Sequence, residues 1–321
     1  MPASARAAIF PDHWIKDGTW NNHGISWIET EHRKGERTAL LIHGFGACKE
    51  HWRHNVTALT GEHRVVALDL LGFGTSDKPP SILDGEQPNP EGVRYSIDLW
   101  ANQVVDFIEH HGLADVALIG NSIGGVVALR AAEILEERDQ PAAMVVLIDC
   151  AQRAIDDKRV SEQPPFRAFS RPLLKQLVRQ RWLTRSLFLS LARPGVIRRV
   201  LQLAYPTGAS VDDTLVEVLH RAARSPGATE SFRGFINLFN DHLAPDVLQR
   251  LQTPVRMIWG EADPWEPLSQ AQQWTRFACV RELTVIPSLG HCPHDEGPKQ
   301  VNPVLQRMLN PNGSPAAEQN S

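Results

Sequence analysis

The chain has 321 residues, of which 42% are hydrophobic and 22% are charged, proportions typical of a soluble globular protein with a large core. Its formal net charge of −4 gives no overall field that favours nucleic acid, so we expect no nucleic-acid partner. The sequence contains no uncharged apolar run of about 18 residues, and its first ten residues lack the apolar centre of a signal peptide, which together predict a cytoplasmic protein without a transmembrane helix.

Short apolar runs recur along the chain and predict the strands of one sheet. Helical patterns lie between several of them: one follows Ser96, a predicted N-cap with Asp98 in the first turn, and the next spans Val126–Arg138. Strands that alternate with helices favour a mostly parallel sheet with both faces covered, whereas the first runs are too close together for helical crossovers and predict an antiparallel edge. The predicted strands are Ile25–Ile28, Ala39–Ile42, Val65–Leu70, Val116–Ile119, Met144–Ile148, Val255–Trp259 and Leu283–Ile286.

The alternation stops between Cys150 and about Pro254, where the pattern predicts helices without strands. We interpret residues 151–240 as a helical cap inserted into a core formed by residues 1–150 and 241–310, and we expect the polar, turn-rich residues 311–321 to be disordered. The predicted cap helices are Leu173–Leu191, Val196–Ala204, Val211–Ala223 and Thr229–Asn240.

A serine between two glycines follows the predicted strand Val116–Ile119. The segment Gly120-Asn121-Ser122-Ile123-Gly124 joins this strand to the helix that follows, which is the layout of a nucleophile elbow. The turn is sharp, so its neighbours must be small, and glycine has no Cβ to clash. Ser122 is therefore the candidate nucleophile.

A serine hydroxyl needs a base to take its proton and an acid to orient the base. Where the nucleophile sits on such an elbow, the acid and then the histidine follow it along the chain. Asp263 comes directly after the strand Val255–Trp259, and His291 comes after Leu283–Ile286, so they are the candidate acid and base. The competing candidates are Glu261 and Asp149 for the acid and His294 for the base.

An oxyanion hole requires two backbone N–H groups aimed at the reacting carbonyl oxygen. Ile123, directly after the serine, supplies one in this interpretation. The second is assigned to Phe45, in the His-Gly-Phe-Gly segment after the strand Ala39–Ile42, where glycines let the backbone approach a substrate.

Taken in order, these segments resemble the α/β-hydrolase fold over roughly residues 23 to 310. More narrowly, the chain resembles the chlorophyll dephytylases and pheophytinases of photosynthetic organisms, and it looks closer to the dephytylases because His43 is present. The segments that carry the resemblance are 43–46, 68–77, Ser96-Ile97-Asp98-Leu99-Trp100 with Gln103-Val104, 120–125, Gly260-Glu261-Ala262-Asp263-Pro264-Trp265 and Gly290-His291-Cys292-Pro293-His294-Asp295-Glu296.

The resemblance implies an esterase that hydrolyses the phytyl ester of chlorophyll or a related chlorin, at or near a photosynthetic membrane. A general carboxylesterase or lipase acting on smaller acyl substrates, and a non-catalytic module that keeps the fold to bind a ligand, remain the alternatives. Asn121 and Trp265 are candidate pocket residues, although plain packing explains such a tryptophan equally well. Glu296 is interpreted as an anion at the start of the helix Pro298–Leu309.

We expect no metal site and no cofactor. The histidines and acids show no HExxH or comparable ligand spacing, and the four cysteines are scattered without CxxC spacing, which favours reduced thiols.

The first half of the cap is basic. Residues 151–200 contain twelve Lys and Arg and three Asp and Glu, a net charge of +9, so the rest of the chain carries −13. Leucines, Trp182 and Phe188 recur among these cations at helical spacing. Two interpretations remain open: an amphipathic cap packed over the active site with solvated arginines, or a basic face that lies on an anionic membrane.

Overall fold

The computed structural model describes residues 9–32, 36–162 and 165–310, with side chains omitted for residues 165–170. The tail predicted to be disordered, residues 311–321, lies outside the described residues.

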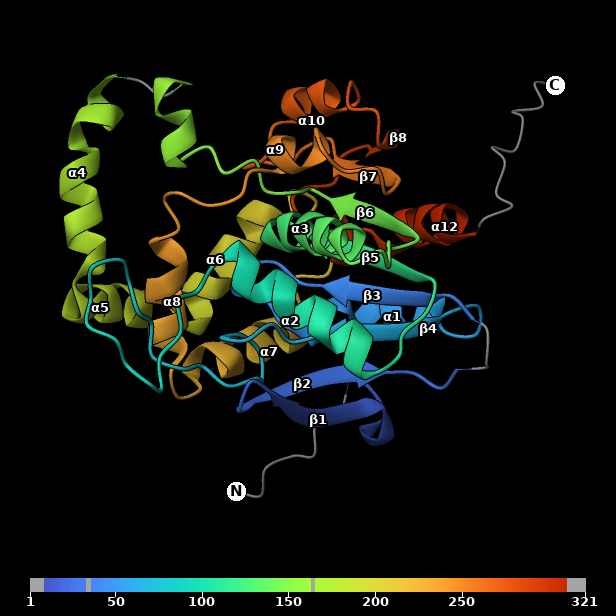
Figure 1. Ribbon diagram of the computed structural model, residues 1–321, viewed down its shortest axis with the longest axis horizontal. Helices are drawn as coiled ribbons and strands as arrows, with labels where there is room; N and C mark the ends of the chain where they lie inside the picture. Colours follow the sequence, from blue (N-terminus) through green and yellow to red (C-terminus); the bar gives the residue numbers. More distant parts are fainter. Residues whose placement is uncertain (1–8, 33–35, 163–164, 311–321) are drawn as a thin grey trace.

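One sheet of eight strands forms the centre of the molecule, in the order β1-β2-β4-β3-β5-β6-β7-β8 (Figure 1). Pairing is parallel from β4 to β8 and antiparallel between β1, β2 and β4, which confirms the predicted antiparallel edge. The strands are β1 Ile15–Trp20, β2 His23–Glu29, β3 Thr38–Ile42, β4 Arg64–Leu68, β5 Val116–Asn121, β6 Met144–Ile148, β7 Val255–Gly260 and β8 Val280–Ile286.

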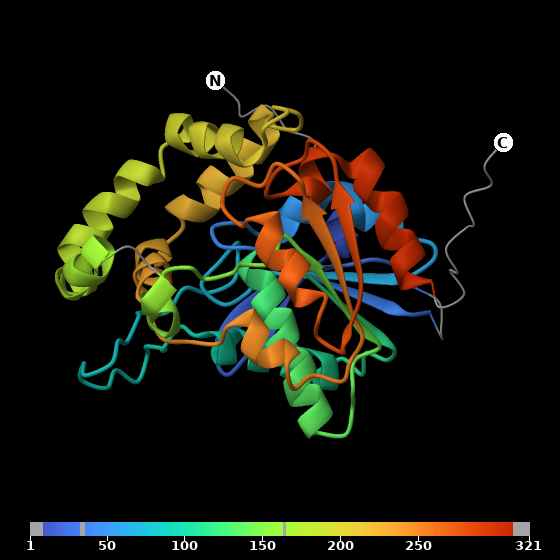
Figure 2. The same ribbon diagram turned by 90° about the horizontal axis from the view of Figure 1, so that it is seen from above.

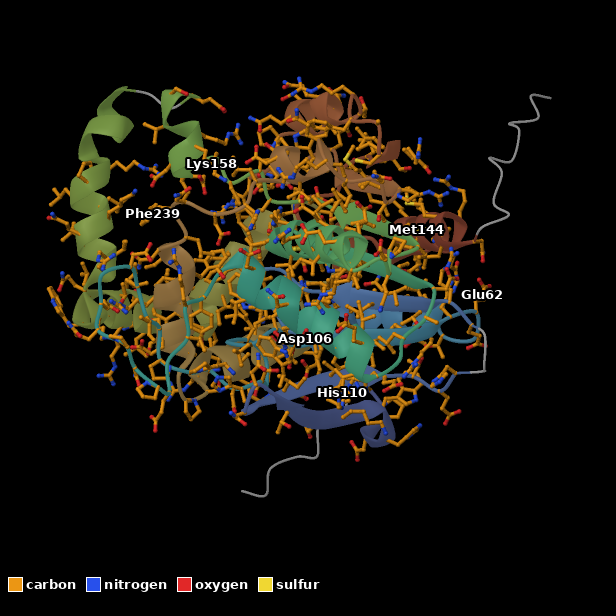
Figure 3. All side chains as sticks on the ribbon, viewed as in Figure 1. Glu62, Asp106, His110, Met144, Lys158 and Phe239 are labelled. Atoms are coloured by element: carbon orange, nitrogen blue, oxygen red, sulfur yellow. The ribbon has the colours of Figure 1, made fainter. Side chains whose placement is uncertain are left out.

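The edge strand β1 was not predicted. Most of its side chains are exposed, and the sequence Ile-Lys-Asp-Gly-Thr-Trp lacks the apolar run by which the other strands are visible. Its last residue, Trp20, is buried and donates from its indole N–H to Asp106 of α2 (Ile97–His110) at 2.9 Å. Figure 3 labels Asp106 and shows how α2 lies next to this edge of the sheet.

Helices cover both faces of the sheet, as predicted. On one face α2, α3, α9 and α10 bury their apolar residues in one core, and on the other α1 and α12 close a second core. The Ser96 hydroxyl accepts the Leu99 N–H at 3.0 Å, which confirms the predicted N-cap. The remaining helices of these layers are α1 Arg53–Leu59, α3 Ile123–Glu137, α9 Ala244–Leu248, α10 Leu268–Trp274, α11 Pro293–Glu296 and α12 Pro298–Leu309, with short 3-10 helices η1 Asp12–Trp14 and η2 Lys49–Trp52.

The segment between β6 and β7 contains helices and no strand in its described residues, and we keep the name cap for residues 151–240. The predicted helix Leu173–Leu191 is two helices, because Gln180 has an extended backbone (ψ 114°) that ends α4 and begins α5. Figures 1 and 2 place α4 and α5 at the end of the molecule farthest from α12. The elements are η3 Asp157–Glu162, α4 Pro165–Arg179, α5 Arg181–Leu191, α6 Pro194–Ala204, α7 Asp213–Arg224 and α8 Ala228–Ile236.

Phe239, labelled in Figure 3, lies beside α4, in the stretch of chain that follows α8. The Lys175 ammonium lies 5.0 Å and the Arg171 guanidinium 5.4 Å from the centroid of its ring. Both cations also pair with Asp157 of η3. Cation–π contacts and ion pairs therefore help to hold α4, whose Leu173, Leu174 and Leu177 are exposed.

Candidate active site

Ser122 sits on a strained turn between β5 and α3. Its backbone angles are φ 54° and ψ −125°, a region that residues with a side chain rarely occupy. The turn is held by two hydrogen bonds across the sheet edge, from the Ser122 N–H to the Ile148 carbonyl and from the Ala151 N–H to the Ser122 carbonyl, each 3.0 Å. The serine therefore stands at the carboxyl end of β5, at the N-terminus of a helix.

The glycines around Ser122 are required by close backbone contacts. A Cβ on Gly120 would lie 2.2 Å from the Gly124 carbonyl oxygen, and one on Gly124 would lie 2.4 Å from the Ile42 carbonyl oxygen. A Cβ on Gly44 would come within 3.1 Å of the Ser122 Cβ. The loop after β3 thus lies directly against the serine.

Asp263 and His291 are paired. The Nδ1 atom of His291 lies 2.8 Å from Oδ2 of Asp263, and both side chains are almost fully buried. The other carboxylate oxygen, Oδ1, accepts the backbone N–H groups of Trp265 and Glu266 at 2.8 and 3.1 Å. These bonds fix the carboxylate, which in turn fixes the orientation of the imidazole and leaves Nε2 as the ring nitrogen that Asp263 does not contact.

The competing residues lie in other surroundings. Neither ring nitrogen of His294 has a partner among the described residues, and the ring packs against Trp52 and His51. Within the part of the chain that the structure describes, the Glu261 carboxylate accepts one hydrogen bond, from the Ser288 N–H at 3.3 Å. Asp149 is fully buried at the end of β6, where Oδ1 accepts the Gly260 N–H at 2.9 Å.

Three carboxyl groups gather beside His291 and differ in pKa. Burial raises the pKa of Asp263, but the hydrogen bond and charge of His291 outweigh burial and lower it below its usual range. Burial raises the pKa of Asp149 well above its usual range, and the neighbouring Asp263 carboxylate raises it further. Burial also raises the pKa of Glu266 to about 7. The Gln152 N–H, which donates to this carboxylate at 2.9 Å, lowers the pKa but does not outweigh burial. Of the three carboxyl groups, Asp263, next to the imidazole, is therefore the one that ionises most readily.

The two expected oxyanion donors belong to the turns that meet at Ser122. Ile123 is the first residue of α3, so its N–H has no acceptor within the helix. Phe45 lies in the turn after β3, which His43 braces: its Nδ1 lies 2.8 Å from the Gly44 carbonyl, and its Nε2 accepts the Leu70 N–H at 3.1 Å. Burial lowers the pKa of His43, so it stays neutral in this bracing role.

Asn121 and Trp265, the two candidate pocket residues, have different surroundings. The Asn121 amide is buried and donates to the carbonyls of Ile148 and His291, at 3.2 and 3.1 Å. These contacts tie the elbow to the histidine loop. Trp265 is 42% exposed, and its ring lies edge-on to the His291 ring at 4.8 Å.

An apolar pocket adjoins the loop that carries Phe45. The Phe45 ring stacks on Phe235 at 3.8 Å and contacts Phe73 and Phe232. Phe188 of α5 closes the pocket from the cap. Glycines, alanines, Ser231 and Lys78 complete its lining, so its surface is largely hydrocarbon.

Sequence reasoning missed how the cap holds the histidine loop. Glu296 accepts the Gly290 N–H at 2.6 Å, the Thr207 N–H at 2.8 Å and the Thr207 hydroxyl at 2.6 Å. It thus joins the loop before His291 to the chain that follows α6, in addition to standing before α12 as interpreted from the sequence. Thr207 and Glu296 lie 89 residues apart, and no spacing in a single sequence indicates a hydrogen bond between them.

A model of the alpha/beta hydrolase family matches residues 39–304, which is most of the chain. The chain therefore belongs to the alpha/beta hydrolase family, as the order of its motifs and its mostly parallel eight-stranded sheet indicate. It aligns with the crystal structure of a serine hydrolase involved in carbazole degradation (CarC) with a TM-score of 0.69 and 18% identity, over 92% of this chain and 98% of the other, a likeness of fold.

The relatives have different activities. The chain is 26% identical to the dihydrolipoyllysine-residue acetyltransferase component of the acetoin cleaving system of Pseudomonas putida, over 89% of this chain and 65% of that protein. It is 25% identical to the chloroplastic pheophytinase of Arabidopsis thaliana, over 84% of this chain and 60% of the relative. It is also 25% identical to the (lyso)-N-acylphosphatidylethanolamine lipase of Mus musculus, over 90% and 84%. The chain spans less than two thirds of the length of the first two, and the family alone does not select a substrate.

Across residues 9–32, 36–162 and 165–310, no helix combines the length and the apolar character needed to cross a bilayer.

Proposed function

We propose that this chain is a serine hydrolase that cleaves carboxylic esters through an acyl-enzyme. The observation that carries the proposal is the strained Ser122 elbow, tied through the Asn121 amide to the His291 carbonyl at 3.1 Å, together with the buried His291–Asp263 pair joined at 2.8 Å. Backbone strain of this kind persists only where the surrounding structure maintains it. The sharp turn presents the serine hydroxyl at the end of the strand.

In this mechanism His291 Nε2 takes the Ser122 proton while the serine oxygen bonds to the ester carbonyl carbon. The proton then passes from His291 to the departing alkoxide, so the alcohol leaves and the acyl group stays on the serine. Water, deprotonated by His291 in the same way, attacks the acyl-enzyme and releases the acid. Asp263 keeps Nδ1 protonated and stabilises the imidazolium in both steps.

The carbonyl oxygen becomes negative in each tetrahedral intermediate, and the N–H groups of Phe45 and Ile123 are proposed to stabilise it. Two features support this role: the Ile123 N–H lies at the positive end of α3, and Gly44 lets its loop lie within a van der Waals contact of Ser122. These residues carry out the reaction without a cofactor.

The substrate we favour is a hydrophobic ester, and specifically the phytyl ester of chlorophyll or pheophytin. The lining of the aromatic pocket beside Phe45 is largely hydrocarbon, which favours an apolar substrate, and one relative is a pheophytinase. Trp265, half exposed against His291, is proposed to contact the chlorin side of the ester. The second candidate is a general carboxylesterase or lipase, which the relationship to the mouse lipase supports.

Incubation of the purified protein with chlorophyll a, pheophytin a, a short and a long nitrophenyl ester tests the proposal, with Ser122→Ala as the matched control. Chlorin-acid release by the wild type and not by Ser122→Ala supports dephytylation. Turnover of nitrophenyl esters alone supports the general esterase and rejects the phytyl substrate. Inactivity on all four, or equal activity of Ser122→Ala, rejects Ser122 catalysis of ester cleavage.

A further inference from the structure

The outer side of the cap carries an unusual number of exposed apolar side chains. Of the fourteen large hydrophobic residues exposed in the described part of the chain, nine lie on α4, α5 and α6. Trp182 is the most exposed of all, at 72%. The nine are Leu173, Leu174, Leu177, Trp182, Leu187, Leu189, Leu191, Val200 and Leu203.

On α5 the apolar and basic residues share one stripe. Trp182, Arg185 and Leu189 are three and four residues apart, so they lie on the same side of the helix, and all three are exposed. The opposite side carries the buried Thr184 and the partly buried Phe188, which lines the aromatic pocket. One helix therefore separates this pocket from a solvent-facing apolar stripe.

Helix α6 repeats the arrangement. Arg199, Val200 and Leu203 are exposed on one side, while Leu201 and Ala204 are buried on the other in a small core with Tyr205 and the residues of α7. Among the described residues, α6 packs on α7 through its buried side and leaves Arg199, Val200 and Leu203 exposed.

The charge of this region is one-sided. Residues 163–211 contain nine Lys and Arg and no Asp or Glu. Arg171, Arg181 and Arg198 form ion pairs with acids from neighbouring elements. The side chains of Arg185, Arg193 and Arg199 form no ion pair or hydrogen bond with any described residue. Three unpaired cations thus lie among exposed apolar side chains.

We propose that this outer cap face, formed by Trp182, Arg185 and Leu189 of α5, by Arg193 directly before α6, and by Arg199, Val200 and Leu203 of α6, docks on the surface of an anionic lipid bilayer. Apolar side chains enter the acyl boundary, a tryptophan settles at the interface, and unpaired arginines meet the acidic headgroups. A second copy of the chain fits less well, because a symmetric contact would set these arginines against one another. The proposal concerns binding and stands whether or not the phytyl ester is the substrate.

The test is co-sedimentation of the full chain with vesicles of phosphatidylcholine alone and vesicles in which roughly a third of the lipid is phosphatidylglycerol. We expect binding to the anionic vesicles at low salt that weakens as salt rises. Arg185→Glu/Arg199→Glu should weaken it at least tenfold, since each cation near the surface contributes about a factor of five. Trp182→Ser/Leu203→Ser should reduce the binding that survives at high salt.

The matched control is Arg276→Glu/Arg281→Glu, which reverses two exposed arginines next to and on β8 and should bind as the wild type does. Turnover of a soluble short ester, or circular dichroism if no ester is turned over, verifies that each variant is folded. The proposal is overturned if the wild type does not sediment with anionic vesicles at low salt, or if the cap and control variants bind equally. It is also overturned if the cap substitutions only dissolve a dimer of the chain.

Discussion

The backbone N–H of His291 donates a hydrogen bond of 2.9 Å to the carbonyl oxygen of Ala204, the last residue of α6. The proposed catalytic histidine is therefore held directly by the cap. Glu296 strengthens the same junction by accepting hydrogen bonds from Gly290 and Thr207. The cap therefore lines the pocket and also holds the loop of the proposed base.

Replacing Glu296 by alanine should damage both stability and catalysis. The Gly290 N–H and both donors of Thr207 would lose a buried acceptor, at a cost of about 2–4 kcal/mol in the free energy of unfolding. Because the histidine loop would shift, we expect kcat/KM for an ester to fall roughly ten- to hundredfold. Urea unfolding and steady-state kinetics measure the two effects. Glu296→Gln keeps an acceptor oxygen and should lose less.

Glu62→Ala is the control for this junction, because Glu62 is exposed and Figure 3 shows it at the other end of the molecule from α4. Should Glu296→Ala retain wild-type kcat/KM while losing stability, the junction would be structural only.

Asp263→Asn should leave the fold intact and lower kcat by about 10³–10⁴. The amide cannot keep the imidazole in the required tautomer or stabilise its charged form. Kinetics on a nitrophenyl ester, with Glu261→Gln as a neighbouring control that stays active, provide the measurement. If Asp149→Asn is inactivated to this extent and Asp263→Asn is not, the orienting acid is at the end of β6.

Glu266 should make the folded protein less stable as pH rises from about 4.5 to about 7. Its pKa is about 7 in the fold and near 4.5 unfolded, so within this window the folded state keeps a proton that the unfolded state has released. Ionising the buried carboxyl then costs of the order of 3 kcal/mol by the upper end of the window. Urea unfolding across this pH range should show the loss, and Glu266→Gln should flatten it; an unchanged slope in that variant would assign the effect to another group.

Phe45→Ala should discriminate against long substrates. The backbone N–H remains, but the stacking with Phe235 and the contacts with Phe73 and Phe232 are lost. We expect kcat/KM for a long-chain nitrophenyl ester to fall about ten- to hundredfold, with a small change for the acetyl ester. Phe45→Leu should lie in between. An equal loss for both esters would show that the ring supports the loop and not the substrate.

Local chemistry made much of this fold predictable. The apolar runs and the Gly-Asn-Ser-Ile-Gly turn depend on residues that are close together in the sequence. They therefore predicted seven strands and a strand–turn–helix at Ser122. Asp263 and His291 were found because the carboxyl ends of parallel strands meet at one edge of a sheet. The structure brings these two side chains together; the roles assigned to them remain predictions.

Features that depend on distant partners escaped the sequence. The polar, exposed β1 is a strand because β2 pairs with it, and the break at Gln180 divides a helical pattern that is continuous in the sequence. His51 and Tyr205 form a buried hydrogen bond of 2.7 Å although they are 154 residues apart. Such contacts depend on how the cap packs on the core, and the periodicity of apolar residues in the sequence does not predict that packing.

The backbone of Ser122 has a consequence for engineering. Glycine would adopt the same positive φ without strain, so Ser122→Gly should relax the turn and can raise the melting temperature of a protein that no longer reacts. A library screened for heat resistance alone would therefore enrich the loss of the proposed nucleophile. Any search for a thermostable form of this chain needs turnover as a second criterion from its first round.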